Sequence, residues 1–481
     1  MTVPALSAEL TTPGRGHAGK GTANDLPIAP PAPPTFQCPG EAHPIGAAVH
    51  YQRLANGYAR CHDCVHRSEH GLLPLPPQRL LRSPRTIADL FLPEGIRGIV
   101  PNELTDRVAC DFGRAIGQTL WHGMDAGETG PDDLPRPIRR RPPVLVVGID
   151  GRPSSPRLAG SLVRGLRESA VEILDAGRIT EPMLRWGTDH WRADAGLFVT
   201  GAGHAASFGG FQLIAPAGRT WCAGGPLDRL REAMSHAAGR PRRTGGDYRT
   251  IDAEAGYLAA LQGETHGLRP VHVGIATADP VLRAACEEVL APSPIEVSPL
   301  PLHDTETEMR RGPWDLGVTF SEEGSRGDFR DECGDLIPPE DLVRQLGRQL
   351  LGEWSHVSIA VATDRLPTLE RDAATDEFLL FHDGGPTSAT LVAAMDSVGA
   401  QLGLDAAGRI WLTDGETGPR CDGLLVLLRI LALLSRRAEP TSWLRRPTAR
   451  TEPDRATDRP ARIADVARTE AGSAAGPGRP A

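Results

Sequence analysis

The residues best suited to chemistry near the amino terminus are cysteines and histidines. Cys38 and His43 enclose four residues, and seventeen residues later Cys61 and Cys64 enclose two. Two short pairs of thiolate and imidazole donors, separated by a hairpin-length insert, are typical of a closed, structural zinc site. Donors this soft favour zinc over magnesium. We expect residues 35–73 to form a small zinc-ribbon-like module, which is also a candidate docking point for a protein partner.

The fourth ligand of this zinc site stays open, because further histidines crowd the same segment. The alternatives to His43 are His50, His62, His66 and His70. The competing interpretation is that the cysteines are unrelated to one another and lie in a reducing compartment.

A second group of candidate residues lies in the glycine-rich turn Gly201-Ala202-Gly203-His204, directly after the strand-like run 196–200. In open α/β sheets, ligands bind at the carboxyl ends of strands. Gly201 and Gly203 can present backbone N–H groups to an anion. The neutral imidazole of His204 is a nucleophile near pH 7, although a plain polar contact is the alternative role.

Strands and helices must position these groups, and the sequence predicts α/β units in tandem. Residues 144–148 are an uncharged, β-branched run that is long enough for a buried parallel strand and too short for a helix. A helix beginning near Pro156 and a second strand at 171–174 follow. The expected organisation is a disordered segment at 1–34, the zinc module at 35–73, α/β domains at 84–240, 245–350 and 355–437, and a disordered tail at 438–481.

Composition narrows the classes of partner and compartment. The chain has 481 residues, is 40% hydrophobic and carries a net charge of −9, so nucleic acid and anionic membranes are not expected partners. No apolar run reaches the ~18 residues of a membrane span, and no secretory signal is visible. Eight cysteines spread over this length do not indicate a disulfide framework, so we expect a cytoplasmic protein.

Several ordered segments resemble the first domain of the α-D-phosphohexomutases, the phosphoglucomutase/phosphomannomutase family. The matching segments are Gly95-Ile96-Arg97-Gly98, Leu104-Thr105, Gly113 to Gly117, Gly148-x-Asp150-x-Arg152-Pro153-Ser154-Ser155 and Val199-Thr200 with Gly210-Phe211. The resemblance implies tandem three-layer α/β/α domains, I to III, of a hexose-phosphate enzyme, with the fourth domain apparently absent. It also places family arginines at Arg97 and Arg152, which suit an anion such as a sugar phosphate.

The family's chemistry requires a serine that carries a phosphoryl group. The resemblance puts this serine on Ala202, or on Gly203 after a shift of one residue, and neither side chain can be phosphorylated. His204 or Ser207 would have to replace it.

The family's magnesium-binding aspartates fall on Ser321, Glu323 and Ser325, and Arg326 matches the family's arginine. One carboxylate and two hydroxyls make a poor magnesium-binding site. The adjacent Glu322 adds negative charge, but adjacent residues at a strand end tend to point apart. The family's sugar-selecting loop falls on residues 404–409, where its glutamate, serine and histidine are all replaced.

We therefore expect a divergent family member that is inactive as a mutase and keeps a sugar-phosphate or anion site at Arg97, Arg152, Gly201, Gly203, His204 and Arg326. One alternative is an active phosphotransferase that uses His204 or Ser207. The other is an interaction protein built on the zinc module.

Overall fold

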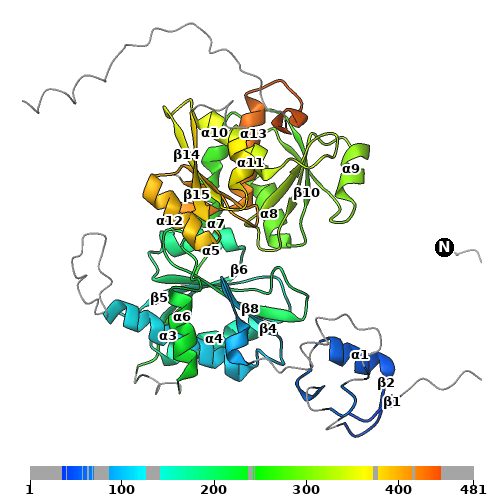
Figure 1. Cartoon of the computed structure of the whole chain (residues 1–481), viewed down its shortest axis with the longest axis vertical. Coiled ribbons are helices and arrows are strands. Elements are labelled where there is room, and N and C mark those ends of the chain that lie inside the picture. Colours follow the sequence, from blue (N-terminus) through cyan, green and yellow to red (C-terminus); the bar gives the residue numbers. More distant parts are fainter. Residues whose placement is uncertain are drawn as a thin grey trace, which may run out of the picture. The chain divides into compact units, whose positions relative to one another are not determined.

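The computed structural model describes residues 35–38, 41–56, 58–61, 64–67, 69, 86–125, 141–236, 242, 244–371, 378–413 and 418–445. Two compact units, residues 1–84 and 85–481, divide the chain, and each is described by itself (Figure 1). The segment predicted to be disordered at 1–34 lies outside the described residues, as do His62, His70 and residues 446–481 of the predicted tail.

The amino-terminal unit is a short hairpin followed by one helix. Strand β1 (Thr35–Phe36) pairs antiparallel with β2 (Ile45–Gly46), and α1 (Ala47–Ala55) and the 3-10 turn η1 (Ala59–Cys61) follow. Its hydrophobic cluster consists of Leu54 and Cys61 with the half-buried Tyr51. A core this small does not normally hold a fold together without a further staple.

The second unit begins with a seven-stranded sheet in the order β3-β4-β8-β7-β5-β6-β9. Strands β5, β6, β7 and β9 are parallel, and β3, β4 and β8 join by antiparallel pairing. The strands are β3 (Phe91–Leu92), β4 (Gly95–Ile99), β5 (Val144–Ile149), β6 (Glu172–Arg178), β7 (Ala195–Val199), β8 (Phe208–Ile214) and β9 (Tyr248–Thr250). The strands predicted near 144, 171 and 196 are thus present as β5, β6 and β7.

Helices cover both faces of this sheet (Figure 1). The helical elements are η2 (Ile87–Leu90), α3 (Asp106–Asp125), α4 (Ser155–Glu168), α5 (Glu181–His190) and α6 (Pro226–Ser235). Helices α3 and α4 pack very closely, because a Cβ on Gly113 would lie 2.2 Å from the Leu162 carbonyl and one on Gly165 would lie 2.0 Å from the Cys110 carbonyl. Glycine at both positions therefore permits the crossing.

The second sheet has the order β11-β10-β12-β13. Its elements are α7 (Ala253–Leu261), η3 (Gln262–Thr265), β10 (His272–Ala276), α8 (Pro280–Leu290), β11 (Glu296–Pro299), α9 (Thr305–Arg311), β12 (Leu316–Phe320), β13 (Gly327–Arg330) and α10 (Pro339–Leu350). Strand β9 (Tyr248–Thr250), just after the boundary predicted at 245, pairs with β6 of the first sheet.

The third sheet has the order β15-β14-β16-β17-β18. Its elements are β14 (Val357–Ala362), α11 (Leu366–Arg371), β15 (Leu379–Gly385), α12 (Ser388–Val398), β16 (Leu402–Leu404), β17 (Ile410–Thr413), β18 (Pro419–Cys421) and α13 (Gly423–Ser435). Helix α13 is buried almost all round, and Asp422 caps it by accepting from the N–H groups of Leu424 and Leu425.

The chain stays ordered past residue 438, where a disordered tail was predicted. Residues Thr441–Arg445 form the 3-10 turn η5. Leu444 is fully buried, and Ser442 donates to Glu332 through both its N–H and its hydroxyl. The Arg- and Pro-rich composition of this segment did not indicate the burial of Leu444 or the hydrogen bonds between Ser442 and Glu332. Among the helices of the described residues, none has the length and apolar character to cross a membrane.

Candidate functional site

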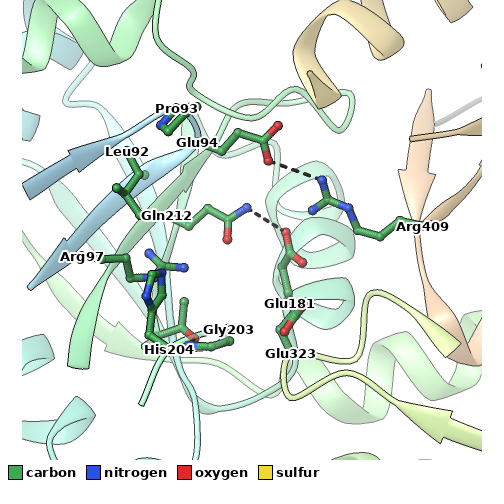
Figure 2. Close-up of a pocket in the computed structure, with 13 residues that line it drawn as sticks. Leu92, Pro93, Glu94, Arg97, Glu181, Gly203, His204, Gln212, Glu323 and Arg409 are labelled. Carbon is green, nitrogen blue, oxygen red and sulfur yellow. Dashed lines mark hydrogen bonds and ion pairs between the residues drawn. The ribbon is translucent and has the colours of Figure 1, made fainter. Parts of the chain in front are cut away.

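The carboxyl end of β7 opens onto a cavity of about 380 Å³ that draws residues from all three sheets' loops. The first domain contributes the β3–β4 turn, the start of α5, the turn after β7 and one residue of β8. Glu323 follows β12, and Arg409 precedes β17. The lining consists of Leu92, Pro93, Glu94, Gly95, Arg97, Glu181, Thr200, Ala202, Gly203, His204, Gln212, Glu323 and Arg409 (Figure 2).

The turn after β7 holds its own backbone N–H groups. Gly201 N–H donates to Asp150 Oδ2 (3.0 Å), Ala202 N–H to Thr200 Oγ1 (2.9 Å) and His204 N–H to the Gly201 carbonyl (3.2 Å). Gly203 has a φ of +77°, which glycine adopts without strain. The amides of Gly201, Ala202 and His204 in the expected anion-binding turn therefore already have protein acceptors.

The candidate nucleophiles separate in the structure. His204 lines the cavity, and its ring stacks on Phe208 with 5.3 Å between the ring centroids. Ser207 is not among the cavity-lining residues, and its carbonyl accepts from the Val100 N–H (2.9 Å). Ala202 lies at the cavity with no group that can carry a phosphoryl.

Arg152 holds this turn from outside the cavity lining. Its Nη1 donates to the carbonyls of Ala205 (2.9 Å) and Phe208 (3.1 Å), and its Nη2 donates to the His204 carbonyl (2.9 Å). The same Nη2 lies 2.6 Å from Glu322 Oε2 of the turn after β12. Arg152 therefore links the two turns, and its guanidinium group already pairs with the carboxylate of Glu322.

The turn after β12, where the resemblance places a magnesium loop, is also closed on itself. The Ser321 hydroxyl accepts from the Arg326 N–H (3.1 Å), and the buried Ser325 hydroxyl donates to Glu323 Oε1 (3.0 Å). Glu322 is paired with Arg152, as described above. Because hydroxyl and carboxylate oxygens are engaged in this way, the turn does not fit the compact oxygen cage that magnesium requires.

Arg326 lies outside the cavity lining and braces neighbouring backbone. Its Nη1 donates to the Ala407 carbonyl (2.9 Å), and its Nη2 lies 3.2 Å from Asp328. Arg97, in contrast, does line the cavity, and its Nη1 donates to the carbonyls of Ile96 (3.0 Å) and Phe211 (3.3 Å). Burial lowers the pKa of Arg97, and the carboxylates of Glu323 and Glu181 oppose that shift.

Glu181 and Gln212 are cavity residues that the sequence interpretation missed. Glu181 is 1% exposed, and its Oε1 accepts from Arg185 Nη2 (2.6 Å), Arg185 Nε (3.1 Å) and Gln212 Nε2 (3.2 Å). Its Oε2 is buried and has no hydrogen-bond partner. A glutamate at the first position of a helix reads as an ordinary favourable end charge, so nothing in the sequence singled it out.

Glu94 and Arg409 join the first and third domains across the cavity (Figure 2). Arg409 Nη2 lies 3.3 Å from Glu94 Oε2, and its Nε lies 2.5 Å from Asp405 Oδ2. Ser388 donates to Glu94 through its N–H (2.9 Å) and hydroxyl (2.7 Å). Burial raises the pKa of Glu94, but Arg409 and Ser388 outweigh that effect and hold it below its usual range.

In the amino-terminal unit, Cys38, Cys61 and Cys64 are all buried and unpaired by disulfides. Burial raises the pKa of Cys38 and raises that of Cys61 to about 11, and neighbouring thiols of this set add to both shifts. His43 is exposed. Across the described parts of the chain, however, no three His, Cys, Asp or Glu side chains are gathered as a metal site.

The other described histidines of this unit, His50 and His66, both contact Glu69. His50 is fully buried, its Nε2 lies 3.0 Å from the Glu69 carbonyl, and its Nδ1 has no hydrogen-bond partner. His66 Nδ1 lies 2.8 Å from Glu69 Oε1. His50 therefore has a ring nitrogen without a hydrogen-bond partner in the interior of the unit. His43 is exposed and places no ring nitrogen in that interior.

Comparison with known proteins gives a consistent result. Residues 88–221 match the family model described as phosphoglucomutase/phosphomannomutase, alpha/beta/alpha domain I. A phosphoglucomutase of Neisseria gonorrhoeae is 24% identical over 381 residues, covering 74% of this chain and 77% of that protein. A phosphomannomutase/phosphoglucomutase of Pseudomonas aeruginosa is 23% identical over 56% of this chain and 58% of its own length.

Solved structures show the same fold. A phosphoglucomutase/phosphomannomutase family protein of Burkholderia thailandensis superposes with a TM-score of 0.63 at 20% identity, over 74% of this chain and 79% of that one. A putative phosphomannomutase of Thermus thermophilus gives a TM-score of 0.59 at 17% identity, over 74% and 82% of the two chains.

Proposed function

We propose that this chain, whose residues 88–221 match domain I of the phosphoglucomutase/phosphomannomutase family, binds a hexose or hexose phosphate without catalysing the mutase reaction. The observation that carries the proposal is the turn after β7. Ala202 and Gly203 line the cavity where the resemblance puts the phosphorylated serine. A methyl group and a hydrogen atom cannot form the phosphoenzyme on which the reaction depends.

The turn after β12 supports the same conclusion. Phosphoryl transfer depends on charge neutralisation by a metal ion or by cationic groups. Ser321, Glu322 and Ser325 are instead hydrogen-bonded or paired to protein groups. Loss of both elements leaves a shaped cavity with polar side chains, which suits binding.

His204 carries the alternative function, an active phosphotransferase, because it is the candidate nucleophile that lines the cavity. Label transfer separates the two functions. The full chain is incubated with a hexose bisphosphate labelled at phosphate, and protein-bound label is measured after quenching at neutral and acidic pH. The proposal predicts no label. Acid-labile label that disappears in His204→Ala would establish the alternative.

Binding itself is tested by isothermal calorimetry of the full chain with glucose, glucose 1-phosphate and mannose 1-phosphate. We expect saturable binding of a hexose or hexose phosphate that Arg409→Ala weakens, since Arg409 lines the cavity. A chain that binds none of these compounds would contradict the proposal.

We also propose that zinc holds the amino-terminal unit together, with Cys38, Cys61 and Cys64 as ligands and the fourth ligand still open between His43 and the other histidines. Three buried thiols beside a minimal core support this proposal. The metal would supply the cross-link that the core lacks. Docking of a protein partner on this unit remains the interaction-class alternative.

A further inference from the structure

We infer that the cavity recognises a hexose-sized ligand through an ammonium group and disfavours a phosphate. This inference rests on the proposed binding function and specifies its ligand. The cavity volume of about 380 Å³ lies at the small end of the range for ligand sites.

The carboxylate of Glu181 has one oxygen without a hydrogen-bond donor. This side chain is 1% exposed and lines the cavity, and all its hydrogen bonds are made through Oε1. Oε2 is buried without a partner. Figure 2 shows the carboxylate directed toward Gln212 inside the cavity. A buried acceptor of this kind is costly unless a donor reaches it, and a charged donor satisfies it best.

Carboxylates outnumber guanidinium groups in the lining of the cavity. The carboxylates are Glu94, Glu181 and Glu323, and the guanidinium groups are Arg97 and Arg409. A phosphate dianion would therefore lie beside an excess of lining carboxylates, whereas an ammonium group would be attracted by them.

The cations around the cavity already have carboxylate or carbonyl partners. Arg409 is paired with Asp405 and Glu94, and Arg97 Nη1 donates to two backbone carbonyls. Arg185 is bound to Glu181, the Gly218 carbonyl and Thr220. A phosphate would have to compete with these partners for the guanidinium groups of Arg409 and Arg185 and for Nη1 of Arg97.

The turn after β7 offers few backbone donors to an anion. Anion sites of the backbone type need several N–H groups directed at the ligand. Here the N–H groups of Gly201, Ala202 and His204 are directed at Asp150, Thr200 and a carbonyl. A phosphate would therefore have to compete with these protein acceptors for three of the four amides at 201–204.

The test compares four ligands on the unaltered full chain by calorimetry at pH 7: glucosamine, glucose, glucose 6-phosphate and glucosamine 6-phosphate. We expect glucosamine to bind more tightly than glucose and glucose 6-phosphate by about tenfold or more, the ratio that one charge-assisted hydrogen bond supports. Adding phosphate to glucosamine should weaken binding. Glu181→Gln should remove most of the preference for glucosamine over glucose, whereas Glu168→Gln should leave it unchanged, because Glu168 pairs with Arg114 away from the cavity.

The outcomes separate the inference from the function beneath it. Tighter binding of glucose 6-phosphate than of glucosamine would overturn the inference and leave hexose-phosphate binding intact. Equal binding of glucose and glucosamine by the unaltered chain would also overturn it, and needs no variant that must fold. Binding of none of the four ligands would overturn the proposed function itself.

Discussion

Arg152 and Glu322 lie 2.6 Å apart and tie the turn after β7 to the turn after β12. In the family these two turns supply the nucleophile and the metal ligands. In this chain Arg152 links the two turns, because it pairs with Glu322 of the second turn and donates to three carbonyls of the first. The same positions that the resemblance associates with chemistry have become parts of a closed scaffold around the cavity.

Replacing Arg152 should therefore cost more stability than replacing its charged partner. Arg152→Ala leaves three carbonyls without their donor, and we expect the free energy of unfolding to fall by about 2–3 kcal/mol. Glu322→Gln removes only an ion pair whose acidic side chain is 55% exposed, and should cost less than about 1 kcal/mol. Urea denaturation measures both. Equal losses would show that Arg152 acts mainly through the ion pair.

The Glu94–Arg409 contact should make stability depend on pH in a defined direction. The folded-state pKa of Glu94 is lowered, so its contribution is complete above the unfolded-state pKa of about 4.3 and is lost as the pH falls through the folded-state value. Glu94→Gln should be less stable than the unaltered chain at pH 7, by about 1–3 kcal/mol, with the gap closing below about pH 4.

Denaturation series at pH 7, 5 and 3.5 test this dependence, with Glu287→Gln as a control because Glu287 is exposed on α8. A gap for Glu94→Gln that stays constant across the series would mean that the charge of Glu94 contributes nothing.

Zinc content tests the proposal for the amino-terminal unit. The full chain, purified without chelators, should contain about one zinc ion per molecule by mass spectrometry. Cys61→Ser should lose that zinc, and Cys333→Ser should keep it, because Cys333 is exposed in the other unit. Single substitutions of His43, His50, His62, His66 and His70 then identify the fourth ligand. A metal-free chain after growth in zinc-supplemented medium would refute the proposal.

Restoring the missing hydroxyl should not restore chemistry. We expect Ala202→Ser to show no mutase turnover, because Ser321, Glu322 and Ser325 remain engaged within the protein. Addition of Ser321→Asp and Ser325→Asp tests whether a metal loop can be rebuilt. Turnover by Ala202→Ser alone would show that the turn after β12 is not a second barrier.

The sequence was informative about the fold and about what the cavity lacks. The uncharged β-branched run at 144–148 has one sensible structure, a buried parallel strand, and it lies in the middle of the first sheet. The resemblance placed Ala202 at the position of the family's serine, and Ala202 and His204 both line the cavity. Strands and loops can be predicted in this way because strand length, side-chain alternation and loop position depend on residues that are neighbours in the sequence.

The polar network could not be read in the same way. Folding brings Gln212 to Glu181 and Arg409 to Glu94, and Glu181, Gln212 and Glu94 each look like ordinary surface residues in sequence. Arg152 and Arg326 were predicted to bind an anion because they match arginines of the family; their guanidinium groups also donate to backbone carbonyls, which no sequence pattern reveals. The pairing of β9 with β6 was hidden for a related reason, since it joins segments that are distant in the sequence.

A coupled mutase assay tests whether the protein binds sugars without mutase turnover, as we propose. The purified chain is given glucose 1-phosphate or mannose 1-phosphate with magnesium and a hexose bisphosphate activator. We expect no turnover above the rate of the denatured protein, for the unaltered chain and for His204→Ala alike. Turnover that His204→Ala abolishes and Ser207→Ala preserves would contradict the proposed function and identify His204 as the phosphoryl carrier.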